Sequence, residues 1–285
     1  MRFFNIFGAD RVGPAWEYHS DGILWHVRST NVGVVLCEER DHAQKSVTFA
    51  ALAHSSGKVL WKKKFDGRLW WTGIEAIHDD ILFLHGYQNP ELPYHQGITA
   101  VDLLSGACLW ERAEIRFEGV LGDAVVGMTQ LDGGERVESL KLRTGEPIHI
   151  DELEIGSRRD ATEPEDPEFL LPVSIEELGE ERPSVASLVR ARCVGLKIEG
   201  DLQVRVEGNH VAFGYHELVS SAAQPMFRTT LMVLDSMHGT MNYQCILDAA
   251  TPRLVPALFF IHRQMMFAIQ ERSTLLAITM ETPRV

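Results

Sequence analysis

The feature of this sequence that most constrains its fold is a repeated pattern of two β-rich runs joined by a Ser-Gly or Thr-Gly turn. The clearest copies are residues 47–61 and 97–110, and each ends in a tryptophan. Weaker copies occupy residues 137–148 and 230–241. The turn glycine supplies the positive φ that a tight hairpin needs, while β-branched and aromatic neighbours favour half-buried strands. Each copy therefore predicts a β-hairpin.

The spacing of these hairpins indicates a larger repeating unit. The turn glycines are residues 57, 106, 145 and 239, so the intervals are 49, 39 and 94 residues. A period of about 40 to 50 residues is typical of propeller blades. Two more β-like runs precede each of the first three hairpins, which makes four strands per unit. These runs are residues 23–28 and 32–38, 70–77 and 81–85, and 119–121 and 124–131.

The pattern predicts an all-β fold, a β-propeller of about five four-stranded blades, or six if the longest interval contains another. The last β-like runs, residues 257–262, 264–270 and 274–280, amount to only three strands. Residues 14–18 form a β-like run that no other unit uses. We expect this N-terminal strand to pair with the C-terminal blade, which removes an exposed strand edge. Residues 1–285 are then a single propeller domain.

An acidic insertion interrupts the repeats at residues 151–184. It holds twelve acidic residues and three arginines, so it carries nine of the thirteen net negative charges of the chain. Ser174 and Glu177 have the spacing of a capping box, which predicts a short helix. We interpret the insertion as a solvated excursion from the propeller, and an acidic docking arm for a basic partner is the alternative.

The hairpins resemble the repeat of quinoprotein-type propellers, most closely at residues 52–61 and 101–110. In that family the tryptophan packs between neighbouring blades, and we expect the same of Trp61 and Trp110. Quinoprotein dehydrogenases are exported, longer and built from more blades. The resemblance therefore implies the repeat and not the activity, and we assign no cofactor.

Composition restricts the partners and the compartment. A net charge of −13 over 285 residues repels phosphate backbones and anionic lipid surfaces, so we expect no nucleic acid and no membrane partner. No apolar run is long enough to span a bilayer, and we expect no secretory signal. The spacing of the four cysteines matches neither a redox pair nor a zinc site. We therefore expect a cytoplasmic monomer with reduced thiols, at Cys37, Cys108, Cys193 and Cys245.

No nucleotide-binding, hydrolase or metalloprotease motif occurs in the sequence. The residues that could bind a ligand or catalyse a reaction are concentrated in one part of the repeat. If each repeat has four strands, the loop from Gly86 to Gly97 lies on the same propeller rim as the links between blades. Pro90 and Pro93 stiffen this loop, so its polar groups lose little freedom on binding. We expect corresponding loops to converge there. The candidate binding residues are His42, Trp70, Trp71, His85, Tyr87, Gln88, Glu91, Tyr94, His95 and His216.

The segment from Trp70 to Asp102 is similar to the signature of an uncharacterised bacterial family, a domain of unknown function. The matching residues are the WWTGIE run at 70–75 and the LHGYQNPELPYHQGITAVD run at 84–102. The resemblance extends to a family of about this chain length. It implies no activity.

Two functions of different kinds fit these residues. The first is a propeller scaffold that binds a protein or peptide on the rim carrying the Gly86 to Gly97 loop. The alternative is a small-molecule hydrolase or lyase with a His/Glu site on the same rim. His85, His95 and an acidic residue suit zinc or manganese, but twelve histidines make chance clustering easy, and we assign no metal ligands.

Overall fold

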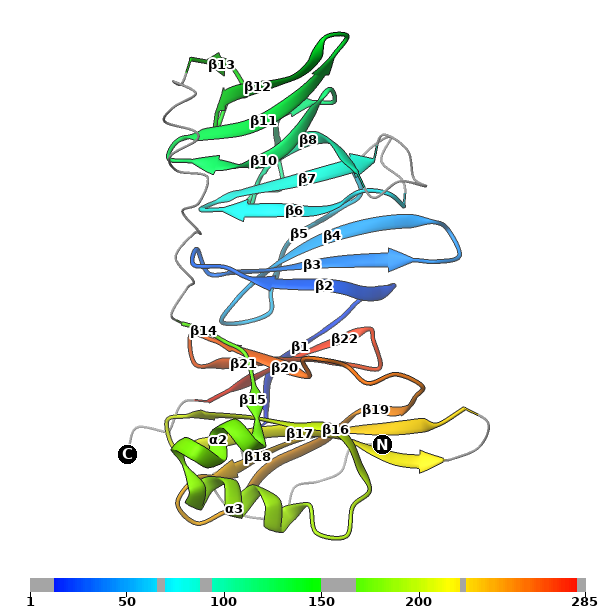
Figure 1. Cartoon of the computed structure of the whole chain (residues 1–285), viewed down its shortest axis with the longest axis vertical. Coiled ribbons are helices and arrows are strands. Elements are labelled where there is room, and N and C mark those ends of the chain that lie inside the picture. Colours follow the sequence, from blue (N-terminus) through cyan, green and yellow to red (C-terminus); the bar gives the residue numbers. More distant parts are fainter. Residues whose placement is uncertain (1–12, 66–69, 88–93, 150–167, 221–223, 281–285) are drawn as a thin grey trace. The chain divides into compact units, whose positions relative to one another are not determined.

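The computed structural model describes residues 13–65, 70–87, 94–149, 168–220 and 224–280. The chain divides into two compact units, one of residues Asp21–Glu165 and one that joins Met1–Ser20 to Asp166–Val285. We describe each unit by itself. The described residues form five antiparallel sheets, which we call blades one to five (Figure 1).

The unit of residues Asp21–Glu165 contains three blades, each with its strands in chain order. Blade one consists of β2 (Ile23–Ser29), β3 (Val34–Asp41), β4 (Ser46–Ala53) and β5 (Val59–Lys63). Blade two consists of β6 (Gly73–His78), β7 (Ile81–Tyr87), β8 (His95–Asp102) and β9 (Cys108–Arg112). Blade three consists of β10 (Ile115–Leu121), β11 (Ala124–Leu131), β12 (Gly134–Lys141) and β13 (Pro147–Ile148).

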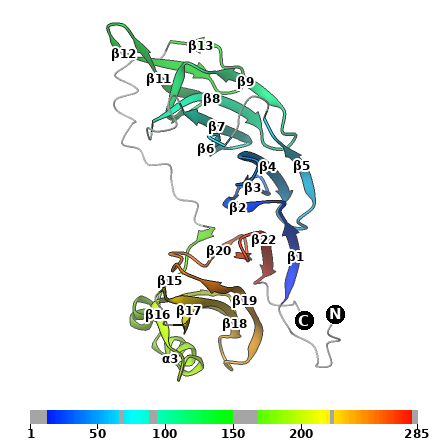
Figure 2. The ribbon, with the colours of Figure 1, turned by 90° about the vertical axis from the view of Figure 1, so that its right-hand side faces the viewer.

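The other unit contains blades four and five and two helices. Blade four consists of β15 (Val173–Ser174), β16 (Ile198–Glu207), β17 (His210–Ser220), β18 (Met226–Asp235) and β19 (Met241–Thr251). Blade five has the order β1 (Pro14–His19), β22 (Thr274–Thr279), β21 (Met265–Gln270), β20 (Phe259–His262) and β14 (Phe169–Leu170). The helices are α2 (Ile175–Glu181) and α3 (Pro183–Arg192), which lie against blade four (Figure 2).

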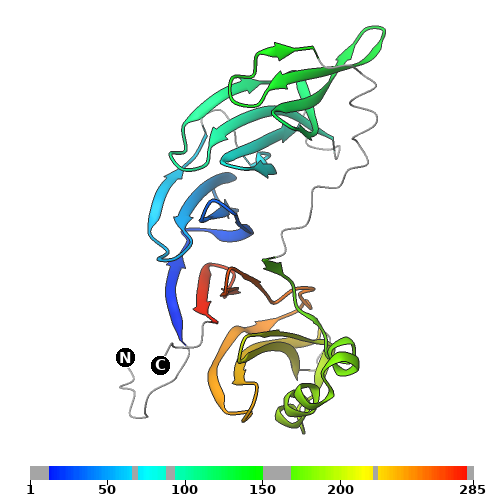
Figure 3. The ribbon, with the colours of Figure 1, turned by 90° about the vertical axis from the view of Figure 1, so that its left-hand side faces the viewer.

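The all-β propeller fold with five blades is confirmed, and so is the pairing of the two chain ends. Strand β1 pairs antiparallel with β22, and Glu17 is opposite Leu276 (Figure 3). Trp16 of β1 packs on Phe267 with their ring centroids 5.8 Å apart. The N-terminal strand therefore covers the edge that β22 would otherwise expose.

Inner strands are buried on both faces, which explains their continuous apolar runs. In β7, Leu82 and Leu84 pack against blade one, while Ile81 and Phe83 pack toward blade three. Successive side chains of a strand point to opposite faces, so this run joins two cores. The order of the three blades in space therefore follows their order in the chain.

A tryptophan of one blade closes on the turn glycine of the next. The Trp61 indole donates from Nε1 to the Leu103 carbonyl at 2.7 Å. A Cβ on Gly106, which has a φ of +68°, would lie 2.6 Å from the Trp61 ring. The same relation joins Trp110 to Gly145 in the next pair of blades. These contacts fix adjacent blades to each other.

In blade four the corresponding glycine meets a helix. The nearest atom to a Cβ on Gly239 belongs to Leu188 of α3, at 3.0 Å. Arg192 of α3 donates to the Gly239 carbonyl at 2.6 Å, as Lys63 donates to the Gly106 carbonyl at 2.8 Å. Helix α3 therefore supplies to blade four the contacts that a strand of the preceding blade supplies to blades two and three.

Part of the acidic segment forms short edge strands that the sequence did not indicate. β14 pairs with β20, and β15 pairs with β16. Helix α2 follows directly, with the Ser174 side chain accepting from the Glu177 backbone N–H at 3.1 Å. The single domain of residues 1–285 stays a prediction, as does the cytoplasmic location. No helix among the described residues is long and apolar enough to cross a membrane.

Candidate functional site

The candidate residues of the first two blades gather at one end of their strands, which we call the rim. This end carries the turn between β3 and β4, the link from β5 to β6, and the ends of β7 and β8 that flank residues 88–93. The strand expected from residue 70 begins instead at Gly73, and Trp70 and Trp71 lie in the turn before it. Blade connections therefore bring separate parts of the sequence together here.

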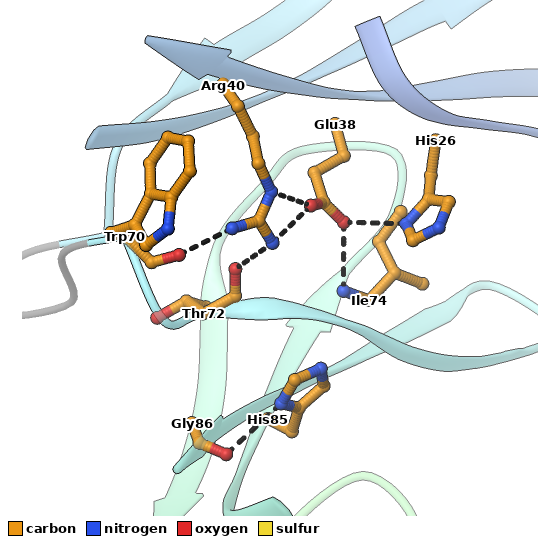
Figure 4. Close-up of polar contacts among 8 residues, drawn as sticks. All are labelled: His26, Glu38, Arg40, Trp70, Thr72, Ile74, His85 and Gly86. Carbon is orange, nitrogen blue, oxygen red and sulfur yellow. Dashed lines mark hydrogen bonds and ion pairs between the residues drawn. The ribbon is translucent and has the colours of Figure 1, made fainter. Parts of the chain in front are cut away.

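A buried ion pair forms the base of the rim (Figure 4). The Glu38 side chain is fully buried, and its Oε1 accepts from Arg40 Nε at 2.7 Å and lies 2.6 Å from Nη2. The other oxygen accepts from His26 Nδ1 at 3.2 Å and from the Ile74 backbone N–H at 3.3 Å. Both carboxylate oxygens are thus satisfied, which a buried charge requires.

Arg40 connects this base to the tryptophan turn. Its Nη1 donates to the Trp70 carbonyl at 2.5 Å, and its Nη2 donates to the Thr72 carbonyl at 3.1 Å. The guanidinium also lies over two indole rings, 5.5 Å from the centroid of Trp25 and 5.2 Å from that of Trp70. Two further side chains pack on the Trp70 ring: His42 and Lys45.

The surroundings of Glu38 determine its charge. Burial alone would raise its pKa, but the hydrogen bond from His26 and the positive charge of Arg40 outweigh burial and lower the pKa below its ordinary value. Glu38 is therefore ionised at neutral pH. The ion pair is a permanent support for the turn above it.

Two histidines stack at the centre of the rim. The rings of His85 and His95 are 3.6 Å apart between centroids and 6° from parallel. His85 is buried, and its Nδ1 donates to the Gly86 carbonyl at 3.1 Å. A Cβ on Gly73 would lie 2.7 Å from His85 Nε2, so the glycine of the WWTGIE run lets the imidazole lie close to β6.

His85 is a neutral imidazole at physiological pH. Burial is the main reason that its pKa is lowered to about 4, and the neighbouring His95 contributes in the same direction. The hydrogen bond to Gly86 opposes these effects. Because a carbonyl only accepts, the proton of the neutral ring is on Nδ1, and Nε2 carries the lone pair.

Glu75 orients the second histidine. Its Oε2 accepts from His95 Nδ1 at 2.7 Å. Strand register shifts between Ile74 and Ala76, and again between Leu84 and Gly86, so Glu75 and His85 both occupy irregular positions in the sheet. Such bulges redirect side chains and are common beside functional sites.

The sequence-predicted residues of this unit that the structure describes all lie at the rim. Tyr87 contacts both histidine rings edge-on, and Trp71 packs against Tyr87 at 6.0 Å. Tyr94, next to His95, is 61% exposed. Gln88 and Glu91 lie outside the described residues.

His216 is in the other unit, within β17, and is buried there. It faces Thr229 Oγ1 at 2.9 Å and accepts from the Val255 backbone N–H at 3.0 Å. Burial lowers its pKa. Thr229 of the neighbouring strand and Val255 of the link between β19 and β20 therefore account for its polar atoms, and its convergence with the rim histidines stays a prediction.

Sequence reasoning missed four residues of the rim: Trp25, Glu38, Arg40 and Glu75. A signal existed for two of them, since Glu38 and Arg40 stand two positions apart at the end of the apolar VVLC run. Opposite charges two positions apart on a strand lie on the same face, so the spacing allowed an ion pair but did not show that it would be buried. Glu75 belonged to the WWTGIE run, but nothing in the sequence showed the bulge that aims it at His95.

The fold and the rim together define an all-β propeller scaffold with an aromatic and histidine-bearing site on its first two blades. The family model of a domain of unknown function, DUF4905, matches residues 29–110. This range includes the rim residues from Glu38 to His95, and the expected resemblance to a family of unknown function is confirmed. No curated protein matches the chain.

The chain is also similar to a solved structure, that of BamB from Moraxella catarrhalis. The two share 11% sequence identity with a TM-score of 0.34, over 95% of this chain and 87% of that one. This similarity carries no argument about function.

Proposed function

We propose that this propeller scaffold binds an extended peptide segment of a partner protein on the rim of blades one and two. The supporting observation is a set of large aromatic side chains that stay exposed above a rigid base. Trp25 is 48% exposed, Trp71 45% and Tyr94 61%. Exposed tryptophan and tyrosine are the residues that dominate the energy of protein interfaces.

The base keeps this surface ordered before a partner arrives. Arg40 lies against Trp25 and Trp70, and its partner Glu38 is fully buried. Trp71 and Tyr87 pack edge to face above the histidine pair. A surface that is already ordered loses little conformational freedom on binding.

The charge of the chain favours a basic partner segment. The net charge of −13 attracts positively charged peptides to the chain over long range, and nine of these charges lie in residues 151–184. The peptide is expected to place apolar anchors on the exposed rings and to carry net positive charge.

Selection from a displayed library of random twelve-residue peptides tests this function. The wild-type protein is expected to enrich a basic sequence family, and the enriched peptide should bind at least tenfold more weakly to Trp71→Ala and to Tyr94→Ala. Leu104→Ala is the control, because Leu104 is 50% exposed in the turn between β8 and β9, at the opposite end of the blade. Failure to enrich, or equal binding by the Trp71→Ala and Tyr94→Ala proteins, would overturn the proposal.

The hydrogen bond from His95 to Glu75 favours a second function, acid–base chemistry on a small molecule. A carboxylate on Nδ1 leaves the lone pair of His95 on Nε2, which suits a general base. Chromogenic nitrophenyl esters and phosphoesters are suitable probes. Turnover that Glu75→Gln and His95→Ala abolish would support this function, and the absence of turnover in the wild-type protein would count against it.

A further inference from the structure

One group of three potential metal ligands occurs among the described residues. Glu75, His85 and His95 each offer a ligand atom, and these atoms all lie within 4.8 Å of one another. Two imidazoles and one carboxylate are a donor set that zinc and other first-row divalent ions bind. We propose that Glu75, His85 and His95 form a binding site for one such ion, and this inference depends on neither function proposed above.

The fold holds the three ligands on adjacent strands. Glu75 is in β6, His85 in β7 and His95 begins β8. Glu75 lies at the register shift between β6 and β7, and His85 lies at the shift between β7 and β8, two of the three register shifts of this sheet. Blades one and three have a corresponding shift between their first two strands, so the bulge at Glu75 belongs to the repeat, and in blade two it lets Glu75 reach His95.

Each histidine is presented with one nitrogen already engaged. His85 donates from Nδ1 to the Gly86 carbonyl, which fixes the ring and leaves Nε2 unprotonated. This is the outer contact that metal-binding histidines usually make. His95 makes the equivalent contact to Glu75 Oε2, and the carboxylate has a second oxygen with which to bind the ion.

The local charge favours a cation. The cluster contains one carboxylate and two imidazoles. The Arg40 guanidinium acts on His85, and its Nη2 lies 3.5 Å from the position of a Cβ on Gly73. Glu38 neutralises Arg40 through a buried ion pair. The remaining charge at the three ligands is the negative charge of the Glu75 carboxylate, which attracts a cation.

Binding an ion requires one ring of the stack to turn. The two imidazoles are nearly parallel, whereas an ion lies in the plane of each imidazole that binds it. His85 is buried and anchored to Gly86, but the His95 side chain is 37% exposed. We therefore expect His95 to rotate toward the ion while His85 stays in place.

Titration of chelator-treated protein with Co²⁺ tests the site, because this ion has visible absorption bands that report its ligands. We expect one Co²⁺ per chain, displaced by Zn²⁺, which binds such ligands more tightly. Glu75→Gln and His95→Ala should each weaken affinity at least tenfold. The control is His238→Ala, which removes an exposed histidine on blade four.

Two results would overturn the metal site: no Co²⁺ bands in the wild-type protein, or an affinity of the Glu75→Gln and His95→Ala proteins equal to that of the wild-type protein.

Imidazole NMR of the wild-type protein is a second test that needs no variant. Zn²⁺ should shift the signals of His85 and His95 and leave those of His238 unchanged. The peptide selection is made with chelator present, so its failure is separate from failure of the metal site.

Discussion

Glu38 is a carboxylate with no exposed side-chain surface, and its charge supports the rim through Arg40. Its pKa is lowered in the folded protein, since His26 and Arg40 together outweigh the opposing effect of burial. In the unfolded chain the same group titrates near its ordinary value of 4.5. Below that pH the unfolded chain therefore binds a proton that the folded protein does not, and acid favours unfolding.

The pH dependence of stability follows from this difference. The contribution of Glu38 is complete above pH 4.5 and is lost as pH falls through its lower folded pKa. Glu38→Gln, which cannot titrate, should be less stable than the wild-type protein at pH 7, and the gap should narrow below pH 4.5. Urea unfolding between pH 3 and 7 measures the difference in unfolding free energy between the two proteins. A gap that stays constant across this range would contradict the assignment.

Gly73 leaves space for the stacked rings of His85 and His95, so adding one carbon atom at this position should destabilise the protein. Gly73→Ala places a Cβ 2.7 Å from His85 Nε2, and His95 covers the other face of that ring. The ring must shift, so we expect a loss of about 1 to 3 kcal/mol in unfolding free energy.

Gly133→Ala is the matched control for Gly73→Ala, since a Cβ there has no atom within 4 Å and neither glycine has a positive φ. Equal stability of the two alanine proteins in urea would show that His85 does not need this space.

At the scale of elements, helix α3 acts in the place of a strand. Leu188 meets Gly239 as Trp61 meets Gly106, and Arg192 reaches the same glycine's carbonyl. The helix pair therefore stabilises blade four through contacts of the kind that a strand makes to blades two and three. Part of the acidic segment thus contributes to a core, through Ile175 and Leu178 of α2.

Shortening the side chain of Leu188 should weaken this contact. Leu188→Ala is expected to lower the unfolding free energy by about 1 kcal/mol, because the side chain is only half-buried. Trp110→Ala, at the equivalent position between blades two and three, should cost about 3 to 5 kcal/mol. Met237→Ala, in the same turn as Gly239 but 75% exposed, is the control. A Leu188→Ala protein as stable as Met237→Ala would exclude this role.

Features that depend on residues close together in the sequence were predictable, whereas features that depend on contacts between more distant residues were not. A Ser-Gly turn, β-rich runs on each side of it and a closing tryptophan are local signals, so the hairpins at Gly57 and Gly106 were predictable. The bulge at Glu75 depends on how β6 aligns with β7, and the burial of Glu38 depends on contacts with the next blade, at Ile74. Leu188 contacts Gly239 in the way that a tryptophan contacts Gly106 and Gly145. This contact joins a helix to a turn some fifty residues away in the sequence, and no local pattern predicts it.

At the scale of the whole molecule, the pairing of β1 with β22 joins the beginning of the described chain to its end. Five residues of β1 pair with β22, among them Trp16, which is 8% exposed. Without β1, the apolar strand β22 would present open backbone donors and acceptors along its edge. Such an edge pairs with other chains.

Removing β1 should therefore change the association state more than the local structure. A chain that lacks residues 1–20 is expected to self-associate at micromolar concentration in light scattering, because β22 and Phe267 become exposed together. A synthetic peptide of residues 13–20 should reverse this by pairing with the vacant edge. A chain that lacks only residues 1–12 keeps β1 and is the control. If the chain without residues 1–20 stays monomeric, the β1 pairing does not protect this edge.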